Sequence, residues 1–425
     1  MDVVTQELAL LGGPRALESP DEDLFRWPAV TVEDEQAVLD VLRAGSMSDW
    51  NITRQFEAEY AAYQGCEYAL SFCNGTAALL AAMYGCGVRR GHEVICPSLT
   101  YWASAMPAFN LGATVVFADI QPDSLCLDPA DIEHRITART RAIVVVHYCG
   151  HPADMDPILD LARRHGLAVI EDVSHAHGAL YKGRLVGSLG DVAAMSLMSG
   201  KALPAGEAGM LCTNDRTIYE RALALGHYER TESDITLPEL RPFVGLPLGG
   251  YKHRLNQTCA AMGRVQLRHY PQRMAEIQQA MNYFWDGLEG VPGLRAHRPP
   301  RDSGSTMGGW YNPLGHYRPE ELGGLPVDRF IQAVNAEGGR SWRAANRPLH
   351  LHPVFNTADI YGDGTPTRIA FADRDLRQGP GSLPVSERLG ERCLGIPWFK
   401  RFDPERIDRW IAAYRKVALQ ANRLL

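Results

Sequence analysis

A lysine in a loop between two apolar runs is the residue of this sequence best placed for covalent chemistry. The stretch Ser196–Gly209 carries Lys201 between the runs Val192–Met195 and Met210–Thr213, which read as short buried strands. A lysine enclosed between buried strands loses hydration, so its pKa falls and its neutral amine can form a Schiff base with a carbonyl compound. Taken alone, the pattern also fits an exposed lysine in an ordinary loop.

An acidic pair upstream of this lysine strengthens the first interpretation. Glu171 and Asp172 end the apolar run Leu167–Ile170 and precede small residues, which is typical of the carboxyl end of a parallel strand, where open α/β sheets bind ligands. An aspartate at that place suits pyridoxal phosphate, because its carboxylate keeps the pyridine nitrogen protonated and makes the ring an electron sink. The competing interpretation of Asp172 is a helix cap.

Seven short apolar runs alternate with helical segments between residues 65 and 270. This rhythm predicts an α/β domain with a mostly parallel, seven-stranded sheet covered by helices. The expected strands are Tyr68–Phe72, Glu93–Cys96, Thr114–Ala118, Ala142–Tyr148, Leu167–Ile170, Val192–Leu197 and Gly209–Thr213. The expected helices between them are Thr76–Gly85, Thr100–Leu111, Pro129–Ile136 and Met155–His165.

Composition divides the chain into three expected parts: a lead-in over residues 1–30, a large α/β domain over 31–274 that binds the cofactor, and a smaller α+β domain over 275–425 that is richer in Pro and Gly. Helical spacing begins at Thr31, a good N-cap. Further helices are expected at Asn256–Arg273, Ala275–Leu288 and Pro404–Ala421.

Overall composition excludes several classes of protein. The 425 residues are 45% hydrophobic and 22% charged, with a net charge of −7 and no long run of one sign, which argues against binding to nucleic acid or to an anionic membrane. The nine cysteines are scattered without metal-ligand spacing, so we expect free thiols in the cytoplasm and no metal site. No signal peptide and no membrane-spanning run is expected.

Five motifs, in order, resemble the DegT/StrS-type sugar aminotransferases, which are fold-type I pyridoxal-phosphate enzymes. These motifs are Asn74–Leu79, Pro97–Trp102, Glu171–Gly178, Ser196–Gly209 and Gly250–Arg254, and the similarity runs from about Leu8 to the C-terminus. The resemblance implies an aspartate-aminotransferase-like fold, pyridoxal 5'-phosphate as cofactor and transamination as the reaction.

Three residues are expected to hold the cofactor phosphate within one chain. Gly75 and Thr76 follow a strand and open a helix, where glycine allows close approach and the free N–H groups attract anions. In the family, this Gly-Thr pair and a serine matching Ser196 bind the phosphate. The resemblance also implies that Lys252, where many relatives have Asn, reaches the phosphate of a neighbouring subunit in a homodimer with shared active sites.

Four residues are expected at the cofactor ring. By resemblance, Lys201 and Asp172 are the catalytic pair, Tyr101 stacks on the pyridine, and His175 lies near the phenolic oxygen. Lys201 would carry a proton between substrate and cofactor in a ping-pong sequence. We expect the neighbouring Trp102 to pack elsewhere.

The substrates are also implied by resemblance. The family's acceptors are keto sugars, keto cyclitols and related cyclic ketones of natural-product pathways such as antibiotic biosynthesis, and its donors are glutamate or glutamine. The N-terminal motif Leu8–Pro14 and the motif His175–Gly178 resemble the branch with scyllo-inosose and amino-hydroxybenzoate enzymes.

Two alternatives stay open: a pyridoxal-phosphate-dependent sugar dehydratase or lyase, and a non-catalytic partner subunit. Lys201 favours transamination, because relatives with His at this position catalyse dehydration. Candidate residues of the substrate pocket are Trp50, His147, Tyr148, His227, Tyr228, His350 and His352.

Overall fold

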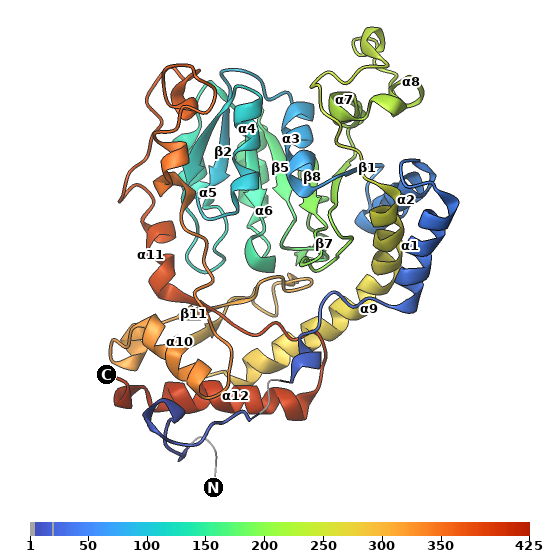
Figure 1. Ribbon diagram of the computed structural model, residues 1–425. Helices are drawn as coiled ribbons and strands as arrows, with labels where there is room; N and C mark the ends of the chain where they lie inside the picture. The colour runs from blue at the N-terminus through green and yellow to red at the C-terminus, as the bar shows by residue number, and fades with distance from the viewer. Residues whose placement is uncertain (1–4, 19–20) are drawn as a thin grey trace.

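A seven-stranded sheet lies at the centre of the upper part of the molecule in the computed structural model, which describes residues 5–18 and 21–425 (Figure 1). Residues 1–4 and 19–20 of the expected lead-in lie outside the described residues. The strand order is β1-β9-β8-β5-β4-β2-β3, with β9 antiparallel to both of its neighbours and the other pairs parallel. This confirms the predicted, mostly parallel sheet. The strands are β1 (Tyr68–Phe72), β2 (Glu93–Pro97), β3 (Thr114–Ala118), β4 (Thr140–Val146), β5 (Ala168–Asp172), β8 (Val192–Ser196) and β9 (Gly209–Thr213).

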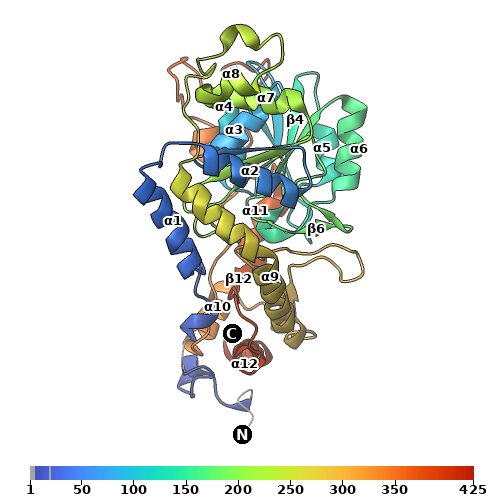
Figure 2. The same cartoon turned by 90° about the vertical axis from the view of Figure 1, so that its right-hand side faces the viewer.

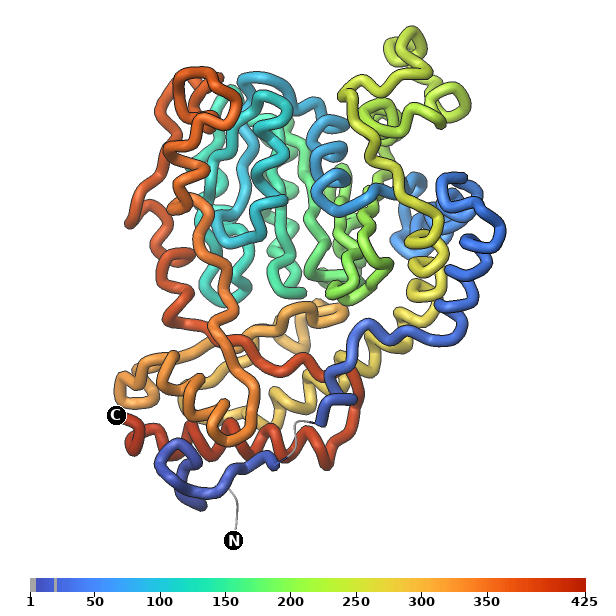
Figure 3. Tube along the Cα trace, in the orientation of Figure 1, coloured from blue at the N-terminus to red at the C-terminus, as the bar shows by residue number. Residues whose placement is uncertain are grey.

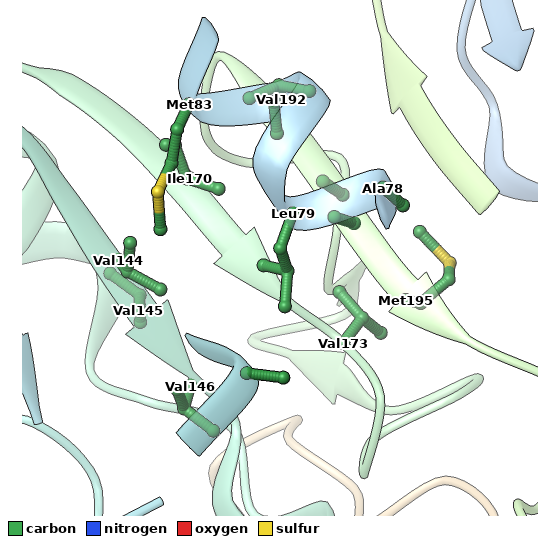
Figure 4. Packing of buried hydrophobic residues seen from close by; sticks show 14 of the residues in the cluster. Ala78, Leu79, Met83, Val144, Val145, Val146, Ile170, Val173, Val192 and Met195 are labelled. Atoms are coloured by element: carbon green, nitrogen blue, oxygen red, sulfur yellow. The ribbon is translucent and has the colours of Figure 1, made fainter. Parts of the chain in front are cut away.

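Helices cover both faces of this sheet. Figure 2 shows α3, α4 and α7 on one face and α5 and α6 on the other, which explains why the strands are apolar on both sides. Leu79 and Met83 of α3 face Val144 and Ile170 of the sheet (Figure 4). The helices of this part are α1 (Val32–Ala44), α2 (Asn51–Gln64), α3 (Gly75–Gly85), α4 (Pro107–Asn110), α5 (Pro129–Arg135), α6 (Met155–His165), α7 (Arg216–Gly226) and α8 (Thr231–Asp234).

A second hydrophobic core lies below the sheet and is joined to the first by one long helix, α9 (Gln257–Gly287) (Figures 1 and 2). It contains a three-stranded antiparallel sheet, and the N-terminal segment runs beside α12, as the tube in Figure 3 shows. The remaining elements are β10 (Leu294–Ala296), β11 (Leu314–Tyr317), β12 (Cys393–Gly395), α10 (Val327–Ala336), α11 (Pro384–Arg392), α12 (Pro404–Leu419) and a hairpin of β6 (Leu180–Tyr181) with β7 (Arg184–Leu185).

The two cores do not follow chain order strictly. Leu8, Leu17 and Leu24 of the lead-in pack in the lower core, whereas Phe355 and Leu376 pack in the upper core. The domain bounds 31–274 and 275–425 therefore stay a prediction. Among the described residues, no helix combines the length and the apolar character that crossing a bilayer requires.

The predicted break between the helices 256–273 and 275–288 and the predicted helix over 100–111 were wrong, and one cap prediction is confirmed. The expected helices at 256–273 and 275–288 form the single helix α9, which contains Pro271; packing against both cores holds the helix together although proline removes one N–H donor. The expected helix over 100–111 is a short 3₁₀ turn at Trp102–Ser104 followed by α4. Thr31 caps α1, because its hydroxyl accepts the backbone N–H of Asp34.

Candidate active site

A cavity of about 390 Å³ opens where the parallel strands end. Its walls come from the segments that follow β1, β2, β4, β5 and β8, the edge at which open α/β sheets bind ligands. One further wall comes from the lower part of the molecule, through Tyr311 and Asn312. The cavity thus lies between the sheet and the second core.

The N-terminus of α3 and the end of β8 meet at one end of the cavity. The side chain of Asn74 caps the helix by accepting the backbone N–H of Ala77 at 2.9 Å. A Cβ atom at Gly75 would fall 2.7 Å from the Cβ of Ser196, so only glycine allows this contact. The first N–H groups of the helix, the Thr76 side chain and the Ser196 side chain therefore line one small region that suits an anion.

A Gly75→Ala substitution is expected to weaken cofactor binding by about tenfold or more, because the added methyl group must push Ser196 and the helix apart. Titration of the apoprotein with pyridoxal phosphate, followed by absorbance, measures the effect. Gly379→Ala is the matched control, since a Cβ at Gly379 meets nothing within 4 Å. Equal cofactor affinity in both variants would show that this contact does not shape the anion site.

Asp172 lines the same cavity, at the end of β5. Its side chain is buried, Oδ2 accepts the Ser104 hydroxyl at 2.7 Å, and Oδ1 accepts the Ser174 backbone N–H at 3.0 Å. Thr100 in turn pairs with Ser104 at 2.9 Å. These bonds fix the direction of the carboxylate and leave acceptor capacity for a group in the cavity.

Lys201 lines the same cavity, from the loop that follows β8. It is 8% exposed, and its Nζ atom lies 4.0 Å from the centre of the Tyr311 ring. Burial lowers the pKa of the Lys201 amine to about 8, although the nearby charge of Asp172 acts in the opposite direction. At pH 7 about a tenth of Lys201 is therefore a neutral nucleophile, a far larger share than for an ordinary lysine with a pKa of about 10.4.

This pKa predicts how the apoprotein reacts with amine reagents. The neutral fraction of Lys201 rises as pH increases through about 8, whereas an ordinary lysine, with a pKa of about 10.4, stays protonated there. Competitive acylation followed by peptide mass spectrometry is expected to give half-maximal labelling of Lys201 near pH 8. Half-maximal labelling near pH 10 would contradict the desolvated amine.

His175 faces the same cavity from the loop after β5. The backbone N–H of Cys149 points at its Nδ1 atom at 3.4 Å, so the neutral ring carries its proton on Nε2. Burial, with the charge of Lys201 as the second cause, lowers the pKa of His175 well below its usual value. His175 is thus a neutral hydrogen-bond donor. His177 packs instead, with Nε2 donating to the Ser196 carbonyl at 2.9 Å.

The cavity gathers seven of the eight residues that the sequence singled out, and their roles stay predictions. The exception is Lys252, which is exposed and does not line the cavity. Trp102 was expected to pack elsewhere, and this was wrong, because Trp102 lines the cavity and is 41% exposed. The seven residues are Gly75, Thr76, Tyr101, Asp172, His175, Ser196 and Lys201.

None of the seven suggested substrate-pocket residues lines this cavity. His147 bonds to buried Glu171, and His227 bonds to the backbone of Ser71. His350 is buried in the 3₁₀ turn Leu349–Leu351, and His352 is exposed between that turn and the next one, Pro353–Phe355. Tyr148 is buried, and its hydroxyl donates to Asn346, which lines the cavity. The others are Trp50 and Tyr228.

Several lining residues escaped the sequence interpretation. Tyr311, Asn312 and Asn346 carry no local signal of a site, because folding brings them in from distant segments, and Ser104 was missed although it lies close to Tyr101 in the sequence. Tyr148 holds Asn346 in place: its hydroxyl donates to the Asn346 side-chain carbonyl at 2.8 Å. Asn312 adopts a positive φ of 50°, which asparagine tolerates better than most residues.

Comparisons with known proteins agree with this geometry. The family model described as the DegT/DnrJ/EryC1/StrS aminotransferase family matches residues 28–415. An L-glutamine:scyllo-inosose aminotransferase from Streptomyces griseus is 36% identical over 96% of this chain and 97% of its own length. A GDP-perosamine synthase from Escherichia coli O157:H7 is 33% identical over 89% of this chain and 94% of its own length. The crystal structure of an aminotransferase from Psychrobacter cryohalolentis superposes with a TM-score of 0.80 at 30% identity, covering 94% of this chain and 99% of that one.

Proposed function

The chain belongs to the DegT/DnrJ/EryC1/StrS aminotransferase family and is a pyridoxal-phosphate-dependent aminotransferase, and from this premise we propose that it moves the amino group of glutamine or glutamate to a cyclic ketone, either a keto cyclitol or a keto sugar. The observation that carries the proposal is one cavity that unites a desolvated lysine, an oriented buried carboxylate and an anion-binding helix terminus. The family implies the cofactor, and the arrangement of these groups fits it.

The residues that would hold pyridoxal phosphate fall into two groups. Gly75, Thr76 and Ser196 suit the phosphate, because the N–H groups and hydroxyls lie where a side chain at position 75 would clash. In the same cavity, Asp172 would keep the ring nitrogen protonated, and Tyr101 would cover one face of the ring. When bound, the cofactor supplies an electron sink for the carbon from which a proton is removed.

Lys201 is the residue of the protein that would form the covalent bond to the cofactor and transfer the proton. Its neutral amine would hold the cofactor through the aldehyde carbon and, once an amino donor has taken its place there, would accept a proton from the donor carbon and give it back on the cofactor side. The amino acceptor retraces these steps in a second half-reaction, so the kinetics would be ping-pong. His175 would donate its Nε2 proton to an oxygen in the cavity.

A homodimer with shared sites is part of the proposal. Among the described residues that line the cavity, Lys201 is the only one with a cationic side chain, yet a phosphate monoester carries nearly two negative charges. Lys252 is exposed and lies in the segment that follows the projecting α8 region (Figure 1). We expect Lys252 of a second copy to supply the missing charge.

The relatives support the substrate class. One is named for glutamine and scyllo-inosose, a cyclitol ketone, and another is named for an amino sugar, so the acceptor proposed here is a cyclic polyhydroxy ketone. Neither name supports the dehydratase, lyase or non-catalytic alternatives. A role in an antibiotic pathway stays a proposal, as does a cytoplasmic location, which the nine unpaired cysteines favour.

The acceptor is tested by a panel assay on the purified holoenzyme. Glutamine is supplied with scyllo-inosose, with nucleotide-linked keto sugars, or with pyruvate as the open-chain control, and the products are identified by mass spectrometry. We expect an amine from at least one cyclic ketone and a much slower reaction with pyruvate. Exclusive use of open-chain 2-oxo acids would contradict the proposed substrate class.

A further inference from the structure

The backbone of Lys201 is held by a side chain from the N-terminal lead-in. The indole N–H of Trp27 donates to the carbonyl oxygen of Lys201 at 2.8 Å. Lys201 lies in the loop between β8 and β9, which has no regular secondary structure of its own, so its position depends on such individual bonds. Two backbone hydrogen bonds also hold the loop: the N–H of Lys201 donates to the carbonyl of Met198, and the N–H of Ala205 donates to the carbonyl of Leu197.

The amine of Lys201 contacts a second aromatic residue, Tyr311, which is connected to Trp27 through a third aromatic ring. Nζ lies over the ring of Tyr311 at 4.0 Å, and Tyr311 packs edge-to-face on Trp398 at 5.7 Å. Trp398 in turn lies 5.9 Å from Trp27, between ring centres, and donates its indole N–H to the carbonyl of Gly309, two residues before Tyr311. Trp27, Trp398 and Tyr311, here called the aromatic clamp, therefore contact both ends of one lysine.

The clamp ties Lys201 to the lower core. Trp27 follows Leu24 and Phe25, and Phe25 packs on Phe399 and Trp410 of that core. Trp398 immediately precedes Phe399. The loop that carries Lys201 is thus tied to residues anchored in the lower core, on the other side of the cavity from the sheet. Trp27 also precedes residue 28, where the match to the family model begins.

We propose that Trp27 is a positioning residue for Lys201: its indole N–H fixes the lysine backbone so that Nζ, resting on Tyr311, reaches both carbon atoms between which it moves a proton. This inference rests on the proposed function, because it assumes that Lys201 transfers that proton. Proton transfer is sensitive to small displacements of the base, so losing the bond is expected to slow that step about 10- to 100-fold.

Two substitutions separate positioning from packing. Trp27→Phe removes the indole N–H and keeps an aromatic ring. Trp410→Phe is the matched control, because Trp410 is buried in the same core, packs on Phe25 at 5.1 Å, and has an indole nitrogen without an acceptor among the described residues. Both variants lose the same atoms from one cluster, and only the first loses a bond to Lys201.

Two measurements decide the matter. Hydrogen exchange of the peptide spanning residues 197–208 in the apoprotein is expected to be faster in Trp27→Phe than in wild type and unchanged in Trp410→Phe. In the holoenzyme, the single-turnover reaction with glutamine is expected to slow about 10- to 100-fold only in Trp27→Phe, with a deuterium isotope effect on 2-deuterated glutamine at least as large as in wild type.

The inference is overturned if the two variants behave alike in exchange and rate, or if Trp27→Phe is slowed with a smaller isotope effect, which would place the slow step elsewhere. Failure of the proposed function looks different. In that case wild type itself transfers no amino group from glutamine, glutamate or alanine, while the exchange comparison still reports whether Trp27 orders the loop.

Discussion

Replacing Lys201 with alanine is expected to abolish the covalent bond to the cofactor and to lower the rate of amino transfer by about 10⁴-fold or more. Both losses follow from one atom, because the same amine bonds to the cofactor aldehyde and carries the proton. Alanine removes that amine from a site where Lys201 is the only cationic lining side chain among the described residues. The visible spectrum of the variant with pyridoxal phosphate, and its rate with glutamine, measure the two losses.

The chain contains a matched control for this experiment. Lys400 is buried to the same degree as Lys201, at 8% exposure, but does not line the cavity. Lys400→Met is expected to keep the absorbance band of the lysine-bound cofactor. Borohydride reduction of wild type followed by peptide mapping should place the cofactor on Lys201. A cofactor found on any other lysine would refute the assignment.

Asp172→Asn is expected to lower the amino-transfer rate by about 10²- to 10³-fold while the cofactor still binds. Asparagine keeps an oxygen for the Ser104 hydroxyl but loses the negative charge that would hold the ring nitrogen protonated. Without that proton the ring withdraws electrons poorly, so the carbon–hydrogen bond of the donor breaks slowly. Single-turnover rates with glutamine on variants of equal cofactor content give the effect.

The neighbouring acid supplies the control for Asp172. Glu171 points to the opposite side of β5, where it accepts His147 and the backbone N–H groups of Gly187, Leu189 and Gly190. Glu171→Gln is therefore expected to lower the melting temperature and to leave the rate per holoenzyme near wild type. The role given to Asp172 is wrong if its variant keeps the wild-type rate.

Much of the site could be predicted because it is local in sequence. Gly75, Asp172 and Ser196 each lie at the end of an apolar run, and the carboxyl ends of parallel strands meet at one edge of a sheet. The strand positions could be predicted equally well, since strands buried on both faces are nearly continuous apolar runs.

The rest of the site depends on contacts between distant segments. Tyr311, Asn346 and Trp27 reach Lys201 or the cavity from segments far away in the sequence, and no periodicity of those segments indicates this. For the same reason, the sequence does not indicate that Leu8, Leu17 and Leu24 pack in the lower core, or that Phe355 and Leu376 pack in the upper core. The sequence pattern predicted a break in α9 at residue 274, whereas packing on two cores keeps that helix continuous.

The central claim is that Lys201 and Asp172 form the active site of an aminotransferase, and one spectrum tests it most directly. The holoenzyme is mixed with glutamine, glutamate or alanine in the absence of any acceptor. We expect one donor to remove the absorbance band of the lysine-bound cofactor and to release one equivalent of its 2-oxo acid per site, and a cyclic ketone then to restore the band. A stable band that no donor changes would contradict amino transfer, and a protein that never forms the band would contradict the site itself.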